Sequence, residues 1–383
     1  MRRRGPLVAF FVLGVFWGGW AALAPAIQVA VGATKGEFGL TLLFIAVGSL
    51  PAMFVAGFVF DRRGPRILPW LIGAFGASVV LPGFAHSTTA LAAALFVVGA
   101  ASGALDVAMN GAVSELEVRR GTRLMQFAHG LFSAGVLAGA LGVGLARQAG
   151  ADPPEILGGI AVVILAAGAL NLRHEHVARL PTQKKRGPRL SRAAIPLGIA
   201  CAAALVIEGG MENWGAIFLE RDLDASPAVS ALAPAAYGGA MMLGRFWGQS
   251  LERRLGDALL LGSGIAVAFA GLVGAALAPN VPVAVASFFV GGAGISIAAP
   301  TLFGAGGRNA EPQERGAAVA TVTTLGYLGF LVGPPVLGGI AEALGLRASF
   351  AALALVAVAL VVAIPRLGLE GRVPGTDPGT RPE

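Results

Sequence analysis

The stretch LAAALFVVGAASGALDVAMNG (residues 91–111) decides the class of fold. It contains one charged side chain, Asp106, in a run long enough to cross the ~30 Å hydrocarbon core of a bilayer as a helix. Because that core offers no water to backbone N–H and C=O groups, a crossing run of this length must be helical. The stretch therefore predicts a membrane-spanning helix that carries a carboxylate.

Similar runs recur along the whole chain of 383 residues, of which 56% are hydrophobic and 13% are charged. Soluble proteins carry about twice that charged fraction. The composition therefore predicts an all-α membrane protein with twelve transmembrane helices. The predicted spans cover residues 7–31, 38–60, 67–85, 88–112, 124–147, 154–172, 193–219, 228–251, 258–278, 281–304, 316–342 and 348–365.

Basic residues are distributed unevenly between the alternate connections of these spans. If the amino end lies in the cytoplasm, the basic residues left outside are Lys35, Arg147, Arg221 and Arg347. This asymmetry is the positive-inside pattern, which predicts that both termini are cytoplasmic. The net charge of +7 then reflects topology rather than a nucleic-acid partner. Arginine far outnumbers lysine, which favours a GC-rich bacterium and its inner membrane.

The most basic segment, RHEHVARLPTQKKRGPRLSR (173–192), separates two halves with six predicted spans each. FVVGA (96–100) matches FVGGA (289–293), and GFVFDRR (57–63) matches GQSLERR (248–254) at nearly the same offset. Parallel repeats of this kind bind a solute near the bilayer midplane. We predict two pseudo-symmetric six-helix bundles, residues 1–172 and 193–366, with a cytoplasmic linker at 173–192 and a short cytoplasmic tail at 367–383.

The stretch GFVFDRRGPR (57–66) resembles the signature of the major facilitator superfamily between its second and third spans. The resemblance rests on Gly57, Asp61, Arg62, Gly64 and Arg66. It implies the major facilitator fold and a secondary transporter that works by alternating access. The second half holds a weaker copy of this motif, with Glu252, Arg253 and Arg254.

Five local patterns are similar to the fucose-permease-like branch of sugar carriers: Trp20 with Pro25, DVAMN (106–110), FAHGLFSAG (127–135), EGGMENW (208–214) and GYLGFLVGPPVLGG (326–339). This similarity implies uptake of a sugar-like or other small polar solute. The first span lacks the carboxylate that proton-coupled carriers of this branch often have, so the expected proton link rests on the titratable residues discussed below. The alternative is proton-driven efflux of amphiphilic or drug-like compounds, because an acidic cavity with aromatic side chains suits cationic drugs as well. We expect no cofactor and no enzyme chemistry, and a monomer whose partners are the solute, protons and the lipid bilayer.

The loop motif suggests a gate. An ionised Asp61 accepts hydrogen bonds and can cap the positive end of a neighbouring helix. Arg62, Arg63 and Arg66 can pair with Glu115 or Glu117 at the end of the fourth span. Such contacts would hold the cytoplasmic face closed, whereas the alternative is that these arginines only anchor the topology.

Asp106 is the first candidate for proton or solute binding. A carboxylate at this depth costs about 2.5–3.5 kcal/mol, so it must face the bundle interior and find a partner. Asn110 lies at i+4 on the same helix face, and His129 lies at a similar depth in the fifth span. An Asp106–His129 pair could relay a proton, since histidine titrates near neutral pH. The alternative is a static clamp between the two helices.

Glu208 and Glu212 form a second polar pair, on one face of the seventh span. With Asn213 and Trp214 nearby, they have the composition of a sugar site, where a ring stacks on an aromatic side chain and hydroxyls form hydrogen bonds. The alternative is that Trp214 and Glu212 belong to the interfacial belt. Arg245 is expected to extend to the membrane surface. Further cavity candidates are Trp17, Trp20, Gln28, Gln126, Tyr237, Thr324 and Tyr327.

Overall fold

The computed structural model describes residues 4–121, 124–172, 191–311 and 314–369, and all regular structure within them is helical. Ten stretches of these residues are long and apolar enough to cross a membrane, as expected of a multi-pass membrane protein. The helices are α1 (Arg4–Ala30), α2 (Lys35–Arg63), α3 (Leu68–Ser78), α4 (Thr88–Arg120), α5 (Met125–Gln148), α6 (Pro153–Leu172), α7 (Ile195–Asp222), α8 (Pro227–Ser230), α9 (Leu232–Leu255), α10 (Asp257–Leu277), α11 (Val281–Ile295), α12 (Ala298–Arg308), α13 (Arg315–Leu344) and α14 (Leu346–Ala363), with 3-10 turns η1 (Gly64–Ile67), η2 (Leu81–Phe84), η3 (Arg192–Ala194) and η4 (Ile364–Arg366).

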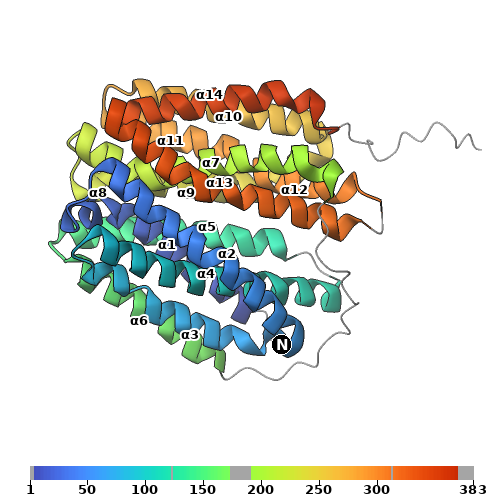
Figure 1. Cartoon of the computed structure of the whole chain (residues 1–383), viewed down its shortest axis with the longest axis horizontal. Helices are drawn as coiled ribbons and strands as arrows, with labels where there is room; N and C mark the ends of the chain where they lie inside the picture. Colours follow the sequence, from blue (N-terminus) through green and yellow to red (C-terminus); the bar gives the residue numbers. More distant parts are fainter. Residues whose placement is uncertain (1–3, 122–123, 173–190, 312–313, 370–383) are drawn as a thin grey trace, which may run out of the picture.

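The helices fall into two groups in Figure 1. Helices α1–α6 lie together in the lower part of the view, and α7–α14 lie together in the upper part. We call these the first and the second helix group. The predicted linker falls almost entirely outside the described residues, as do Arg123 and the tail beyond Leu369. The predicted motif copy at Glu252, Arg253 and Arg254 falls within α9, but its side chains are outside the described part of the structure.

Helix α2 shows how local sequence fixes a helix in this chain. Its start is a capping box, in which the Thr34 hydroxyl accepts the Glu37 N–H at 3.2 Å and the Glu37 carboxylate accepts the Thr34 N–H at 2.9 Å. Its end is Gly64, whose φ of 63° is open to glycine but strained for other residues. Gly64 therefore makes the sharp turn in the 57–66 motif.

Glycines let helices within each group approach closely. A Cβ on Gly99 of α4 would collide with the Ile45 carbonyl of α2, and a Cβ on Gly292 of α11 would collide with the Tyr237 carbonyl of α9. Small residues at such crossings are typical of membrane helices, because association there depends on close packing. Two predicted spans are interrupted: 67–85 comprises α3 and η2, and 281–304 comprises α11 and most of α12.

The molecule has two ends, which we call the Glu220 end and the Asp61 end. The Glu220 end carries the α1–α2, α5–α6 and α7–α8 connections, and the Asp61 end carries the α2–α3, α4–α5 and α12–α13 connections. Alternate helices run between the two ends, so depth along one helix can be compared with depth along its neighbours at 1.5 Å per residue.

Candidate functional site

A cavity of about 300 Å³ lies between the two helix groups, and both contribute to its wall. The lining residues on α1, α4 and α5 begin near the middle of the molecule and continue toward the Asp61 end. Its polar and aromatic lining residues are Phe10, Trp17, Trp20, Ser49, Ser102, Asp106, His129, Phe132, Glu208, Glu212, Asn213, Arg245, Phe303, Tyr327 and Phe330.

Asp106 is hydrogen-bonded within the first helix group and lies near a side chain of the second. Its Oδ1 accepts a hydrogen bond from Asn110 Nδ2 at 3.1 Å, and Asn110 Nδ2 also donates to the Asp106 backbone oxygen at 2.9 Å. The Tyr327 hydroxyl on α13 lies within hydrogen-bonding reach of the same carboxylate. The i, i+4 spacing thus brings Asn110 to Asp106 as predicted, whereas sequence reasoning gave no reason to choose Tyr327 as a partner.

His129 lines the cavity with Asp106, but its contacts differ from the predicted pair. Its ring packs edge-on against Phe10, with ring centroids 5.0 Å apart. Among the described residues, no hydrogen bond or ion pair joins Asp106 to His129. The predicted Asp106–His129 pair is therefore not formed in this structure, and Asp106 has Asn110 and Tyr327 instead.

Arg245 crosses between the helix groups inside the cavity. Its Nη1 donates to the Ser133 hydroxyl of α5 at 2.8 Å, and its Nη2 lies 3.6 Å from Glu208 Oε1 of α7. The guanidinium also lies 6.0 Å from the centre of the Phe132 ring. The prediction that Arg245 extends to the membrane surface is therefore wrong. The physical reason is depth, because α9 continues to Leu255, about ten residues or ~15 Å further.

Glu212 and Asn213 follow Glu208 along the cavity wall. The Asn213 amide donates to the Gly209 carbonyl of its own helix at 2.8 Å, which leaves its side-chain oxygen as an acceptor. Within the described part of the chain, no hydrogen bond or ion pair to the Glu212 carboxylate is found. The i, i+4 spacing therefore places both glutamates in the wall, one paired with Arg245 and one facing the cavity.

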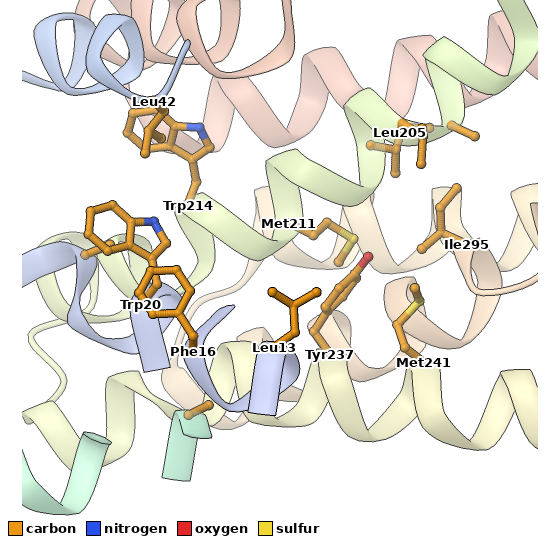
Figure 2. Packing of buried hydrophobic residues seen from close by; sticks show 14 of the residues in the cluster. Leu13, Phe16, Trp20, Leu42, Leu205, Met211, Trp214, Tyr237, Met241 and Ile295 are labelled. Atoms are coloured by element: carbon orange, nitrogen blue, oxygen red, sulfur yellow. The ribbon is translucent and has the colours of Figure 1, made fainter. Parts of the chain in front are cut away.

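Several predicted candidates lie outside the cavity wall. Trp214 is 1% exposed and packs on Phe38 of α2, with ring centroids 6.2 Å apart, so it is neither a cavity wall nor an interfacial belt residue. Tyr237 is 3% exposed, and Figure 2 shows its hydroxyl directed away from α9 toward Met211. The other predicted candidates outside the wall are Gln28, Asn110, Gln126 and Thr324.

The Glu220 end is closed by polar contacts between the groups. Arg147 of α5 forms a two-bond ion pair with Glu220 of α7, with both N–O distances at 2.9 Å. Arg147 also donates to the Ala22 carbonyl at 2.8 Å, and the Ser230 hydroxyl donates to Glu220 at 2.9 Å. The exposed fractions of the paired side chains are 7% and 16%, so this ion pair is largely shielded from water.

Helix α2 adds further contacts to this closure. Lys35 Nζ lies 3.7 Å from Asp222 Oδ1, and the Lys35 backbone N–H donates to Glu342 of α13 at 3.0 Å. Deeper in the same interface, a Cβ on Gly39 would collide with the Pro334 carbonyl of α13. The groups are therefore in backbone contact on the Glu220 side of the cavity.

The motif at the Asp61 end makes contacts that differ from the prediction. Arg62 stacks on the Phe58 ring at 3.6 Å, Glu115 pairs with Arg119 at 3.7 Å, and Glu117 accepts the Leu124 and Met125 N–H groups. No ion pair between the motif arginines and Glu115 or Glu117 is found among the described residues, so the predicted pairing is not formed in this structure and stays a prediction for a conformation closed at the Asp61 end. Glu117 is better placed to cap α5, because a carboxylate is stabilised at a helix N-terminus.

The described residues offer no metal site, since no three His, Cys, Asp or Glu side chains in that part of the chain are grouped closely enough to hold an ion. What the cavity provides instead is three carboxylates, one guanidinium and an imidazole among aromatic side chains. Such a wall can bind a small solute by charge, hydrogen bonding and ring contact.

Comparison with known proteins gives consistent results. The family model of the Major Facilitator Superfamily matches residues 7–257 and 199–382. An uncharacterised MFS-type transporter of Yersinia pestis is 32% identical over 352 residues, covering 91% of each chain. The membrane protein MosC of Rhizobium meliloti is 31% identical over 362 residues, covering 92% of this chain and 86% of that one.

Two solved structures share the fold at low sequence identity. The nucleoside transporter NupG superposes with a TM-score of 0.75 at 14% identity, over 96% of this chain and 99% of that chain. A bacterial homologue of the human lysosomal transporter Spinster, in an inward-facing and occupied conformation, gives a TM-score of 0.69 at 16% identity, over 95% of both chains.

Proposed function

The chain belongs to the Major Facilitator Superfamily, and we propose that it is a secondary transporter that carries a small polar solute through the cavity by alternating access. The observation that carries this proposal is the position of the cavity. It lies between the two helix groups, which are joined by ion pairs and backbone contact on one side of it. A solute held there would be released to the other side when the groups rock.

We propose that the two groups are the six-span bundles of a twelve-span protein. Lys35–Phe84 counts as one apolar stretch but contains both α2 and α3, and α9 has the length of a span although charged residues lower its hydropathy. The glycine crossings support an internal repeat. Gly99 meets Ile45 in the first group, and Gly292 meets Tyr237 in the second, at an almost constant sequence offset.

The Asp61 end is the cytoplasmic end in this proposal. It carries the exposed Arg62, Arg63 and Arg66, together with Arg119 and Arg120 of α4. The positive-inside rule assigns such a cluster to the cytoplasm of a bacterial inner membrane, with both termini on that side. The conformation is then closed toward the outside, with its cavity on the cytoplasmic side.

Asp106 is the proposed proton carrier. It lines the cavity and is contacted by α4 and α13, one helix from each group, so its surroundings change when the groups rock. Movement of the solute with the proton would give uptake, which the sugar-carrier resemblance favours. The aromatic part of the wall supports the second candidate, efflux of amphiphilic compounds in exchange for protons.

Reconstituted protein can separate these candidates. A thermal-shift screen of the purified protein against sugars, polyols and lipophilic cations would identify a ligand, because a compound that binds the folded state raises its stability. That compound is then followed in proteoliposomes under an imposed pH gradient. Accumulation on the alkaline side supports proton-linked uptake, and accumulation on the acidic side supports exchange. Binding without flux under either gradient would contradict the transporter proposal.

A further inference from the structure

We propose that the solute of this cavity carries a positive charge, as a protonated amine. The inference rests on the proposed function for the identity of the cavity as the solute site, and it adds the charge class of the solute.

The charged groups in the wall are unbalanced. Asp106 comes from α4, Glu208 and Glu212 come from α7, and Arg245 from α9 is the guanidinium that faces them. His129 of α5 supplies the remaining titratable group of the wall apart from the Tyr327 phenol. Three carboxylates thus face one permanent cation inside a membrane protein, where unpaired charge is costly.

The single guanidinium is already engaged. It contacts Glu208, the Ser133 hydroxyl and the Phe132 ring. An anionic solute would have to displace Glu208 from Arg245 and expose that carboxylate, whereas a cationic solute leaves the Glu208–Arg245 pair in place. The cavity therefore favours cations over anions before any solute enters.

Two carboxylates remain, Asp106 for the proton and Glu212 for the solute. Asp106 is hydrogen-bonded by Asn110 and lies near the Tyr327 hydroxyl, and neither group neutralises its charge. Glu212 faces the cavity from the opposite helix group, with no cationic partner among the described side chains within ion-pair distance. An ammonium group at Glu212 would supply one missing positive charge with up to three N–H donors, and the proton carried by Asp106 would supply the other.

The other walls suit the same solute. Trp17, Phe303 and Phe330 present aromatic surface to the cavity, and aromatic faces attract cations.

The charge preference can be measured without knowing the solute. The native cysteine is removed by Cys201→Ser, and a thiol is placed in the wall by Ser49→Cys or, separately, Ser102→Cys. Each protein is treated with methanethiosulfonate reagents that carry a trimethylammonium, a sulfonate or a neutral methyl group. Rates relative to the neutral reagent cancel differences in thiol reactivity.

We expect the cationic reagent to react at least about tenfold faster than the anionic one, relative to their rates with a free thiol. The reason is that a negatively charged cavity wall raises the local concentration of cations. Glu212→Gln with Asp106→Asn should abolish most of that difference. Glu155→Gln, in the first turn of α6 and outside the cavity wall, should leave it unchanged.

Three outcomes would overturn these statements separately. Equal rates for the two charged reagents, with normal labelling by the neutral one, would overturn the charge class and leave the transporter proposal standing. Faster reaction of the anion would do the same and point to Arg245 as the solute ligand. Failure of every reagent at both positions would contradict the open cavity itself, and the proposed function with it.

Discussion

The ion pair between Arg147 and Glu220 should set the balance between the two conformations of the transport cycle. Glu220→Gln keeps the shape of the side chain but removes its charge, one oxygen acceptor and most of the attraction to Arg147. A hydrogen bond to a charged group contributes about 1.5–3 kcal/mol, and this pair has two bonds at 2.9 Å between side chains that are 7% and 16% exposed. We therefore expect a loss of about 2–3 kcal/mol.

That loss should favour the conformation open at the Glu220 end, because the pair cannot persist once the groups separate there. At 1.36 kcal/mol per tenfold change, the equilibrium shifts by roughly 30- to 150-fold. An outward-open population of about 1% would rise to between about a quarter and three-fifths of the molecules. The shift is large enough to be seen directly as a change in distance between the groups.

Spin labels at Asp152 and Ala343 would report that distance, since they lie at the Glu220 end of the first and second group. In Glu220→Gln, pulsed electron–electron double resonance should show a population with a longer distance between the spin labels, and this population is minor in the parent protein. Glu37→Gln is the matched control, because Glu37 lies at the same end but caps its own helix. Unchanged distances in a folded Glu220→Gln protein would refute the reasoning.

Three further changes probe the motif and the cavity. Asp61→Asn should leave membrane insertion intact and slow transport about two- to fivefold, which corresponds to a helix-end charge interaction of about 0.3–1 kcal/mol. An unchanged transport rate would mean that the motif only anchors the membrane topology. Asp106→Asn should abolish uphill accumulation in proteoliposomes while counterflow exchange survives, and persistent solute-driven proton uptake would end the proton-carrier proposal. Glu208→Gln should weaken binding of the solute found by thermal shift. It should also lower the free energy of unfolding by about 2–5 kcal/mol, because Arg245 loses its ion-pair partner. A melting temperature equal to that of the parent protein would contradict this.

Much of the fold could be predicted from the sequence because the bilayer restricts the options. A run such as residues 91–111 has no choice but a helix, and its length fixes how far it extends. Spacing along one helix was equally informative, since i, i+4 placed Asn110 at Asp106 and put Glu208 and Glu212 in one wall. Gly64 in the loop motif was also readable, although its φ of 63° came only from the structure.

Contacts between distant segments were beyond that reasoning. Arg147 and Lys35 were visible in the sequence as basic residues on the wrong side of the topology, but nothing local identified Glu220 and Asp222 as their partners. The acidic end of α7 beside two stray basic residues was the available signal. Trp214 was misleading for a related reason, because a tryptophan two residues from a carboxylate points away from it on a helix and packs on Phe38.

Arg245 shows why depth must be judged from the helix end rather than from the apolar run. In the sequence, Arg245 belongs to a basic cluster with residues 253 and 254 and therefore resembles a residue that anchors the helix at the membrane surface. Its position along α9, however, is too deep for the side chain to reach that surface. Its bonds to Ser133 in one group and Glu208 in the other make a second bridge between the groups, inside the cavity. Rocking that separates α5 from α9 at this depth must break that bridge, just as opening at the Glu220 end must break the pair of Arg147. A solute bound beside Glu208 therefore touches the contact that has to change, which couples its binding to the movement that carries it.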